Sequence, residues 1–282
     1  MAGIVRLWIE ALLRRTAQGA ELGDRTPRSR YAVAADEAVR LLTEAGRPAH
    51  APLLRAADTK WREIGLAGGT RLMELATSLG LSDVAIRMVA ALIAIEHDAD
   101  LERACAYAWD DFTRKRPDVG FLIELVSDGD EILREQARAA LSNDAPLRRY
   151  RVLVVGNAND TDTVPPARRT VRLTDRLIGH LLGEDALDPV LEGVAYVAPP
   201  ATIDDLVLPA PVLALARRAL QLTGAPRVLF HGSAGVGKAM LVRALAGAAG
   251  RSVLVVDAAE LVRTPERLDE RMMRVARETV LR

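Results

Sequence analysis

The chain has 282 residues, of which 50% are hydrophobic and 27% charged, so it can bury a core and does not have the composition of a disordered chain. Lys+Arg and Asp+Glu are equal at 38 each, and the resulting zero net charge argues against a protein whose main task is to coat nucleic acid or an anionic membrane. One cysteine, Cys105, excludes an internal disulfide framework and a cysteine-rich zinc site. Arg or Asp interrupts every apolar run before it could span a bilayer, and we expect a cytoplasmic protein.

The first half of the chain has the apolar spacing of helices. The amphipathic N-terminal segment contains Glu10 and no small-residue cleavage site, so we interpret it as a helix and not as a targeting peptide. Ser82 is placed to cap a helix in which Val84, Met88, Leu92 and Ile95 recur on one face. Helices are expected around residues 33–42, 53–64, 82–95, 100–112, 121–125 and 132–141.

The pattern changes after residue 150. Residues 151–156 read as a strand, a polar loop runs through Pro165-Pro166, and Val171 and Leu173 suggest a returning strand before a helix over 175–182. Several helices followed by a strand, a loop and a second strand are the outline of a winged-helix domain. Pro199-Pro200 reads as a linker. We therefore predict a helical region over 1–69, a winged-helix-like domain over 70–198 and a further domain over 199–282.

The strongest chemical signal is a glycine-rich loop between two apolar runs. Residues 227–231 predict a strand, residues 232–239 fit the pattern G-x-x-x-x-G-K, and residues 253–257 predict a second strand. The helix expected between them has an apolar face made by Leu241, Val242, Leu245 and Ala248. The candidate phosphate-binding residues are Gly232, Ser233, Ala234, Gly235, Val236, Gly237, Lys238 and Ala239.

This pattern suits phosphate for three physical reasons. Glycines let consecutive backbone N–H groups turn inward to form a concave anion site. The following helix adds the positive end of its dipole. Lys238 supplies a point charge for the β- and γ-phosphates. The alternative interpretation is a glycine-rich turn with an exposed lysine.

One position departs from the pattern. The residue after the lysine is ordinarily Ser or Thr, whose hydroxyl ligates Mg²⁺, but here it is Ala239. Since the metal neutralises charge that develops during phosphoryl transfer, its loss should impair hydrolysis more than binding. In the alternative interpretation, Ala239 is simply a good helix former and water takes the place of the hydroxyl.

With these motifs, the sequence resembles the AAA+ ATPases, specifically bacterial members with an N-terminal winged-helix domain such as those that accompany contractile injection systems. The resemblance spans about residues 70–282 and rests on the segments DDFTRKRP (110–117), DAPLRR (144–149), LLGED (181–185), LDP (187–189), IDDLVLP (203–209) and VVDAAEL (255–261). It implies an α/β fold class: a mostly helical N-terminal region, a winged-helix-like domain, and the first half of a P-loop AAA+ αβα core.

The resemblance implies ATP-driven remodelling of protein assemblies, in the family usually as a ring, with ATP or ADP held by residues 232–239. Leu206 and Val207 lie where the preceding segment approaches the adenine in relatives. The family also needs a later strand ending in Asp-Glu, a sensor residue and an arginine given to a neighbouring subunit, and none follows residue 257. Asp257 corresponds to the family's second strand and is followed by Ala258, so we do not expect it to be catalytic. We expect negligible ATP turnover by the chain alone.

In the family's sheet, the strand before the loop and the strand over 253–257 are not neighbours. The C-terminal part is therefore a truncated copy, pairs in an unusual way, or is completed by another chain; truncation is the alternative that we favour.

The remaining candidates are weaker. His50, His97, His180 and His231 lack metal-like spacing, and the adjacent Asp110 and Asp111 cannot form an acid–base pair on one helix face. The basic segments 114–116 and 148–149 could touch phosphates, but the domain lacks a dense basic recognition helix, so protein contact is favoured over nucleic acid.

Two hypotheses remain: an ATP-binding AAA+ protein whose winged-helix half recruits a protein partner, or a non-hydrolysing scaffold or nucleic-acid- or protein-binding module with a relic phosphate loop.

Overall fold

The computed structural model describes residues 2–21, 50–67, 70–109, 116–156, 164–202, 206–207, 209–220 and 227–282. The chain forms two compact units, Met1–Ala186 and Leu187–Arg282, which are described separately below. The helix expected around 33–42 and most of the segment 110–117 lie outside the described residues. The domain boundaries that we predicted at 69/70 and 198/199 remain predictions.

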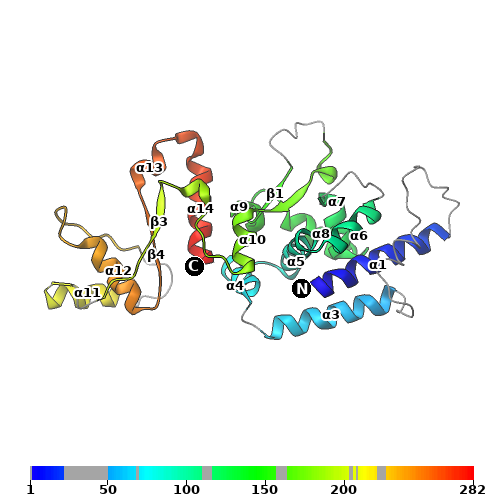
Figure 1. Ribbon diagram of the computed structural model, residues 1–282, viewed down its shortest axis with the longest axis horizontal. Helices are drawn as coiled ribbons and strands as arrows, with labels where there is room; N and C mark the ends of the chain where they lie inside the picture. Colours follow the sequence, from blue (N-terminus) through cyan, green and yellow to red (C-terminus); the bar gives the residue numbers. More distant parts are fainter. Residues whose placement is uncertain are drawn as a thin grey trace. The chain divides into compact units, whose positions relative to one another are not determined.

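Unit 1 is mostly helical and contains one small hairpin (Figure 1). Its helices are α1 (Ala2–Glu21), α3 (His50–Ala67), α4 (Arg71–Leu79), α5 (Asp83–His97), α6 (Ala99–Trp109), α7 (Val119–Ser127), α8 (Glu131–Ala140), α9 (Pro146–Arg149), η1 (Pro166–Arg168) and α10 (Asp175–Leu182). Its strands are β1 (Leu153–Val155) and β2 (Val171–Leu173).

Helix α5 is the centre of unit 1. The Ser82 side chain accepts a hydrogen bond from the Ala85 N–H at 3.3 Å, which confirms the predicted cap. All residues over 84–95 are buried except Arg87, which is partly exposed. Because a helix that is apolar all round needs cover on every side, α5 is surrounded by α1, α4, α6, α7, α8 and β2.

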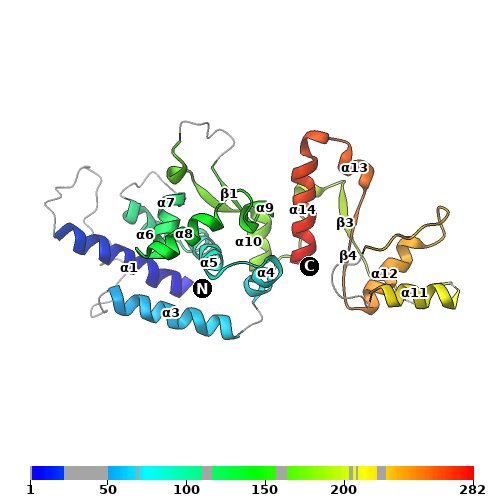
Figure 2. The same cartoon turned by 180° about the vertical axis from the view of Figure 1, so that it is seen from behind.

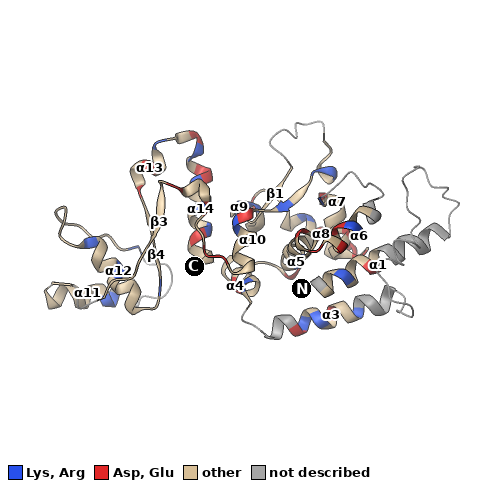
Figure 3. Cartoon of the chain, in the orientation of Figure 1, with Lys and Arg blue, Asp and Glu red and all other residues tan. Residues whose placement is uncertain are grey.

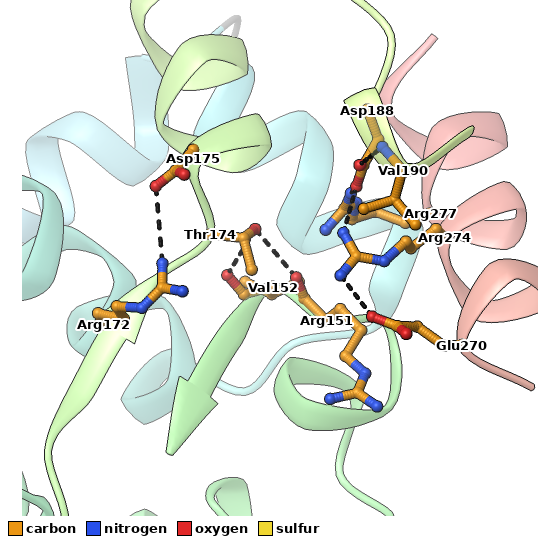
Figure 4. Close-up of polar contacts among 10 residues, drawn as sticks. All are labelled: Arg151, Val152, Arg172, Thr174, Asp175, Asp188, Val190, Glu270, Arg274 and Arg277. Carbon is orange, nitrogen blue, oxygen red and sulfur yellow. Dashed lines mark hydrogen bonds and ion pairs between the residues drawn. The ribbon is translucent and has the colours of Figure 1, made fainter. Parts of the chain in front are cut away.

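The predicted hairpin is formed, with β1 antiparallel to β2 and Val154 opposite Arg172. Asp118 forms a bridge with Thr170, so the residue before α7 extends this small sheet beside β2. Several helices followed by a strand, a loop and a second strand are the winged-helix outline that the sequence predicted. The Thr174 hydroxyl donates to the Arg151 carbonyl at 3.0 Å, which ties the end of β2 to the start of β1 (Figure 4).

Unit 2 contains a two-stranded sheet and several helices (Figures 1 and 2). Its elements are η2 (Pro189–Leu191), β3 (Ala195–Ala198), α11 (Ala210–Leu220), α12 (Lys238–Ala248), β4 (Val253–Val256), α13 (Ala258–Val262), η4 (Pro265–Arg267) and α14 (Leu268–Leu281). Strand β4 pairs antiparallel with β3, with Ala195 opposite Val256.

The strand predicted over 227–231 was wrong: these residues have no strand pairing in the described part of the chain. A strand needs a neighbour for its N–H and C=O groups, and β4, the other strand expected in this part of the sequence, pairs with β3 instead. The run also lacks cover, since the Leu229 side chain is 91% exposed. Strand β4 thus pairs within the chain, and the truncation that we favoured remains a prediction.

Helix α12 is held on one side by an apolar cluster. Leu241 and Leu245 are buried with Ala216 of α11, and Leu206, Leu213 and Phe230 pack against them. On another side, the segment 199–201 approaches the helix closely: Arg243 Nε donates to the Pro199 carbonyl at 2.7 Å. A Cβ on Gly247 would lie 3.0 Å from the Ala201 carbonyl oxygen, so glycine permits this approach. Both contacts hold α12 in place, the second through the middle and the last turn of the helix.

A partly buried cation, Arg87, connects α1 and α3 to α5 in unit 1. The Arg87 side chain donates to Asp83 Oδ2 at 2.7 Å and to Asp58 Oδ1 at 2.9 Å. Its guanidinium carbon lies 5.6 Å from the Trp8 ring centroid and 5.8 Å from that of Trp61. Trp61 Nε1 donates to Asp83 Oδ1 at 2.7 Å, which completes the network.

We predict that Arg87→Ala destabilises unit 1, because it removes two ion pairs and two cation–π contacts from a partly buried site. The expected loss is about 2 kcal/mol of unfolding free energy, measured by urea denaturation. The matched control is Arg103→Ala, which removes an exposed contact with Asp100 and should cost about 0.5 kcal/mol or less. Equal losses for the two variants would contradict this role of Arg87.

Candidate phosphate-binding site

The glycine-rich loop turns sharply into α12 through residues in the left-handed region. Gly235 has φ 79° and Gly237, the N-cap of α12, has φ 84°. A Cβ at either position would meet no atom within 4 Å, so the backbone conformation, and not lack of space, calls for glycine there. The predicted G-x-x-x-x-G-K pattern therefore has a local structural reason.

Several backbone N–H groups at the start of α12 have no hydrogen-bond acceptor among the described residues. The N–H groups of residues 235–239 have no backbone acceptor among the described residues, and α12 has no side-chain cap. Such groups, together with the positive end of the helix, favour an anion. Lys238 Nζ donates to the carbonyls of Gly232 at 3.0 Å and Ser233 at 2.7 Å, so the ammonium lies against the first residues of the same loop. Phosphate binding by residues 232–239 remains a prediction.

A mainly apolar pocket of about 390 Å³ adjoins the loop. It is lined by α11 through Val212, Leu215 and Ala216, by residues 228–231, and by Val236, Gly237, Lys238 and Leu241. Sequence reasoning missed the contribution of α11, whose apolar spacing over 212–216 was the available signal. It named Leu206 and Val207 as the residues near the adenine. Leu206 packs on the neighbouring apolar cluster, whereas the Val207 side chain is 100% exposed and does not line the pocket.

The residues near the loop do not supply a magnesium ligand set. The methyl group of Ala239 cannot coordinate a cation. Among the described residues, no three His, Cys, Asp or Glu side chains are grouped so that they could hold a metal ion. Asp257 caps α13 instead, with Oδ1 accepting from the N–H groups of Ala259 at 2.8 Å and Glu260 at 3.2 Å.

The histidines and the cysteine considered in the sequence analysis lie in different parts of the structure. His97 lies in the last turn of α5, His180 is buried in α10, and His231 lines the pocket beside the loop. The Cys105 thiol is buried, and burial raises its pKa, which keeps it protonated and unreactive. The His50 side chain lies outside the described ones.

Helix α8, which lies between α7 and α9 in the chain, presents paired charges. Arg134 contacts Glu131 and also Glu124, the latter at 3.2 Å, while Arg138 contacts Glu135. The helix contains two arginines and two glutamates and so has no net charge; its charged positions are coloured in Figure 3. Ile132 is 71% exposed on the same helix. An exposed apolar side chain among neutralised charges suits a protein surface better than a phosphate backbone.

Unit 2 also contains a buried ionic cluster (Figure 4). Asp188 accepts from the Val190 N–H at 2.8 Å and from Arg274 at 2.6 Å, and it contacts the fully buried Arg277. Glu270 completes the cluster by accepting from Arg274 at 2.7 Å. Burial acts to raise the pKa of Asp188, but the Val190 N–H and the two guanidinium groups outweigh it and hold the pKa below its ordinary value. The cluster fastens η2 to α14.

Two family models match the chain, one over most of its first two thirds and the other near its C-terminal end. Residues 8–195 match the family described as winged helix domain, variant, and the chain belongs to this family. Residues 228–281 match the ATPase family associated with various cellular activities (AAA). No curated protein and no solved structure matches the chain. The mixed α/β fold class and both parts of the resemblance, winged helix and AAA, are thereby confirmed. Among the described helices, none is long and apolar enough to cross a bilayer.

We predict that Asp188→Asn destabilises unit 2 by about 3–5 kcal/mol at neutral pH, because it removes the carboxylate shared by two arginines in a buried site. Because the pKa of Asp188 is lower in the folded state than in the unfolded state, its carboxylate stabilises the fold fully at pH values above the ordinary carboxyl pKa of about 3.9. This stabilisation is lost as the pH falls through the lower folded-state pKa. The difference between wild type and variant, measured by urea denaturation, should therefore shrink in acid. Asp175→Asn, at an exposed carboxylate, is the control; a pH-independent difference for Asp188→Asn would contradict the assignment.

Proposed function

We propose that this chain is an ATP-binding protein of the AAA class whose winged-helix half contacts a protein partner. One observation carries the nucleotide assignment: the unsatisfied N–H groups of residues 235–239 meet the start of α12 and the ammonium of Lys238 in one loop. The match of residues 228–281 to the AAA family supports it.

In this proposal, the loop amides and the α12 N-terminus bind the phosphates of ATP or ADP. Lys238 exchanges the carbonyls of Gly232 and Ser233 for phosphate oxygens, which carry full negative charge and attract the ammonium more strongly. The apolar pocket between α11 and residues 228–231 accepts the base. Mg²⁺, when bound, neutralises charge on the β- and γ-phosphates. Since Ala239 gives it no hydroxyl, we propose that this chain binds nucleotide without rapid turnover.

The partner assignment rests on α8 in unit 1. Its ion pairs with Glu131, Glu135 and Glu124 neutralise the two arginines that would otherwise face a duplex. We therefore propose that the winged-helix half recruits a protein and not a nucleic acid. We also propose that the chain derives from bacterial, contractile-injection-system-type ATPases that remodel protein assemblies as rings.

The second candidate function is a scaffold with a relic phosphate loop. The two hydrogen bonds from Lys238 to its own loop favour it, because they satisfy the ammonium without a ligand. The candidates differ in one measurement: a nucleotide that binds the folded state raises the melting temperature, whereas a relic loop gives no shift.

We predict that Lys238→Ala abolishes nucleotide binding, because the lysine is the full positive charge in the loop. The measurement is titration with a fluorescent ATP analogue, and the affinity should fall at least about 100-fold, equivalent to about 2.7 kcal/mol. Lys60→Ala, which removes an exposed lysine of α3 in unit 1, should leave the affinity unchanged. Equal affinities for wild type and Lys238→Ala would refute the site.

We predict that Ala239→Thr makes nucleotide affinity depend on Mg²⁺. In wild type, Mg²⁺ should change ADP affinity by about twofold or less and phosphate release should be negligible, whereas the restored hydroxyl should strengthen binding roughly tenfold with Mg²⁺ and leave metal-free binding unchanged. Ala239→Val, which is similar in size to threonine and lacks the hydroxyl, is the control. Rapid ATP hydrolysis by the wild-type chain, lost in Lys238→Ala, would contradict this proposal.

A further inference from the structure

The pocket beside the glycine-rich loop is lined by apolar side chains that are largely uncovered. Among the described residues, twelve large hydrophobic side chains are exposed, and five of them line this one pocket: Val212, Leu215, Val228, Leu229 and Val236. Exposed apolar side chains gathered at one place mark a surface that a ligand or a partner covers. The pocket volume of about 390 Å³ falls within the range of small-molecule sites, about 300–1,000 Å³.

Phe230 supplies this pocket with a phenyl ring. Its side chain is partly buried, packs against the apolar cluster of α11 and α12, and also lines the pocket. The cluster therefore holds the ring in place beside the same cavity that Lys238 lines. A nucleotide base stacks on such a ring through its π face, and this interaction accepts different bases because it does not involve their edges.

Adenine and guanine differ at the edge of the ring system, where adenine presents an amino donor and guanine a carbonyl acceptor. Among the described residues that line the pocket, His231 and Lys238 are the only ones whose side chains can form a hydrogen bond. An imidazole can donate from one ring nitrogen and accept at the other, so His231 matches either base. No carboxylate or amide side chain, which would select one base, is among these described lining residues.

We propose that this pocket binds purine nucleoside phosphates as a class and does not distinguish adenine from guanine. A site discriminates strongly where it makes hydrogen bonds to groups that the competing ligand lacks, whereas an apolar pocket separates ligands weakly and by size. Pyrimidines have a single ring and bury less apolar surface against the pocket wall. The inference rests on the proposed nucleotide function and extends it from ATP and ADP to GTP and GDP.

The test uses the full chain and a fluorescent ADP analogue, which is displaced by unlabelled ADP, GDP, UDP or inorganic pyrophosphate at one salt concentration. The affinities for ADP and GDP should agree within about threefold, and both should exceed that for pyrophosphate at least about tenfold. The affinity for UDP should lie between those for the purine nucleotides and pyrophosphate. These comparisons use the wild-type chain, so they do not depend on the folding of a variant.

A second measurement removes the ring. Phe230→Leu keeps an apolar side chain against the cluster, and it should weaken the binding of ADP and GDP alike by about fivefold while leaving pyrophosphate affinity unchanged. The control Tyr196→Leu makes the same kind of change at a 60% exposed residue of β3 that does not line the pocket. The control variant should bind all four ligands like wild type.

Similar affinities for ADP and GDP, with the loss in Phe230→Leu confined to nucleotides, support the proposal. Four results overturn it: ADP binds at least about tenfold more tightly than GDP, UDP binds as tightly as ADP, ADP binds no more tightly than pyrophosphate, or Phe230→Leu weakens ADP no more than Tyr196→Leu does.

Lys238→Ala separates this proposal from the nucleotide function on which it rests. If one of the four results is found and ADP binding is still lost in Lys238→Ala, the assignment of the base is wrong and the phosphate site stands. If the wild-type chain binds none of the ligands, the proposed nucleotide function fails together with this inference.

Discussion

The functional account depends on one backbone constraint, the left-handed turn at Gly237 that starts α12 without a side-chain cap. This turn leaves the first amides of the helix without backbone acceptors among the described residues and places Lys238 at the first helical position. A helix start of this kind is stable only if solvent or an anion satisfies its donors. The backbone of the loop therefore favours an anion by itself. The mainly apolar pocket beside it favours an apolar group on the same ligand.

The position of the loop comes from helix packing more than from a sheet. In the AAA+ arrangement that the sequence resembles, a strand leads directly into such a loop, whereas residues 227–231 here have no strand pairing and β4 pairs with β3. Contacts with α11 and with the segment 199–201 hold in place the helix α12 that follows the loop. The same packing creates the apolar pocket. The proposed phosphate recognition is thus local to the loop, while the pocket depends on α11.

The sequence predicted well those features that depend on residues close together in the chain. Ser82 caps α5 as expected, the helix over 175–182 and strand β2 have the predicted extents, and the glycines of the loop adopt the conformations that only glycine tolerates easily. What it missed depends on partners distant in the chain. The apolar run at 227–231 resembles a strand, but a strand forms only when another one is beside it, and the pairing of β3 with β4 joins residues far apart in sequence. The lining of the pocket by α11 is non-local for the same reason.

The most direct test of the central claim observes the loop amides themselves. In a ¹⁵N–¹H correlation spectrum of the full chain, ADP should shift the amide signals of Gly235, Gly237 and Lys238, since their N–H groups acquire phosphate oxygens as acceptors. Amides of unit 1, such as that of Gly80, serve as the internal reference and should not move. If saturating ADP leaves the Gly235 and Gly237 signals unchanged, the loop does not bind phosphate and the account is wrong.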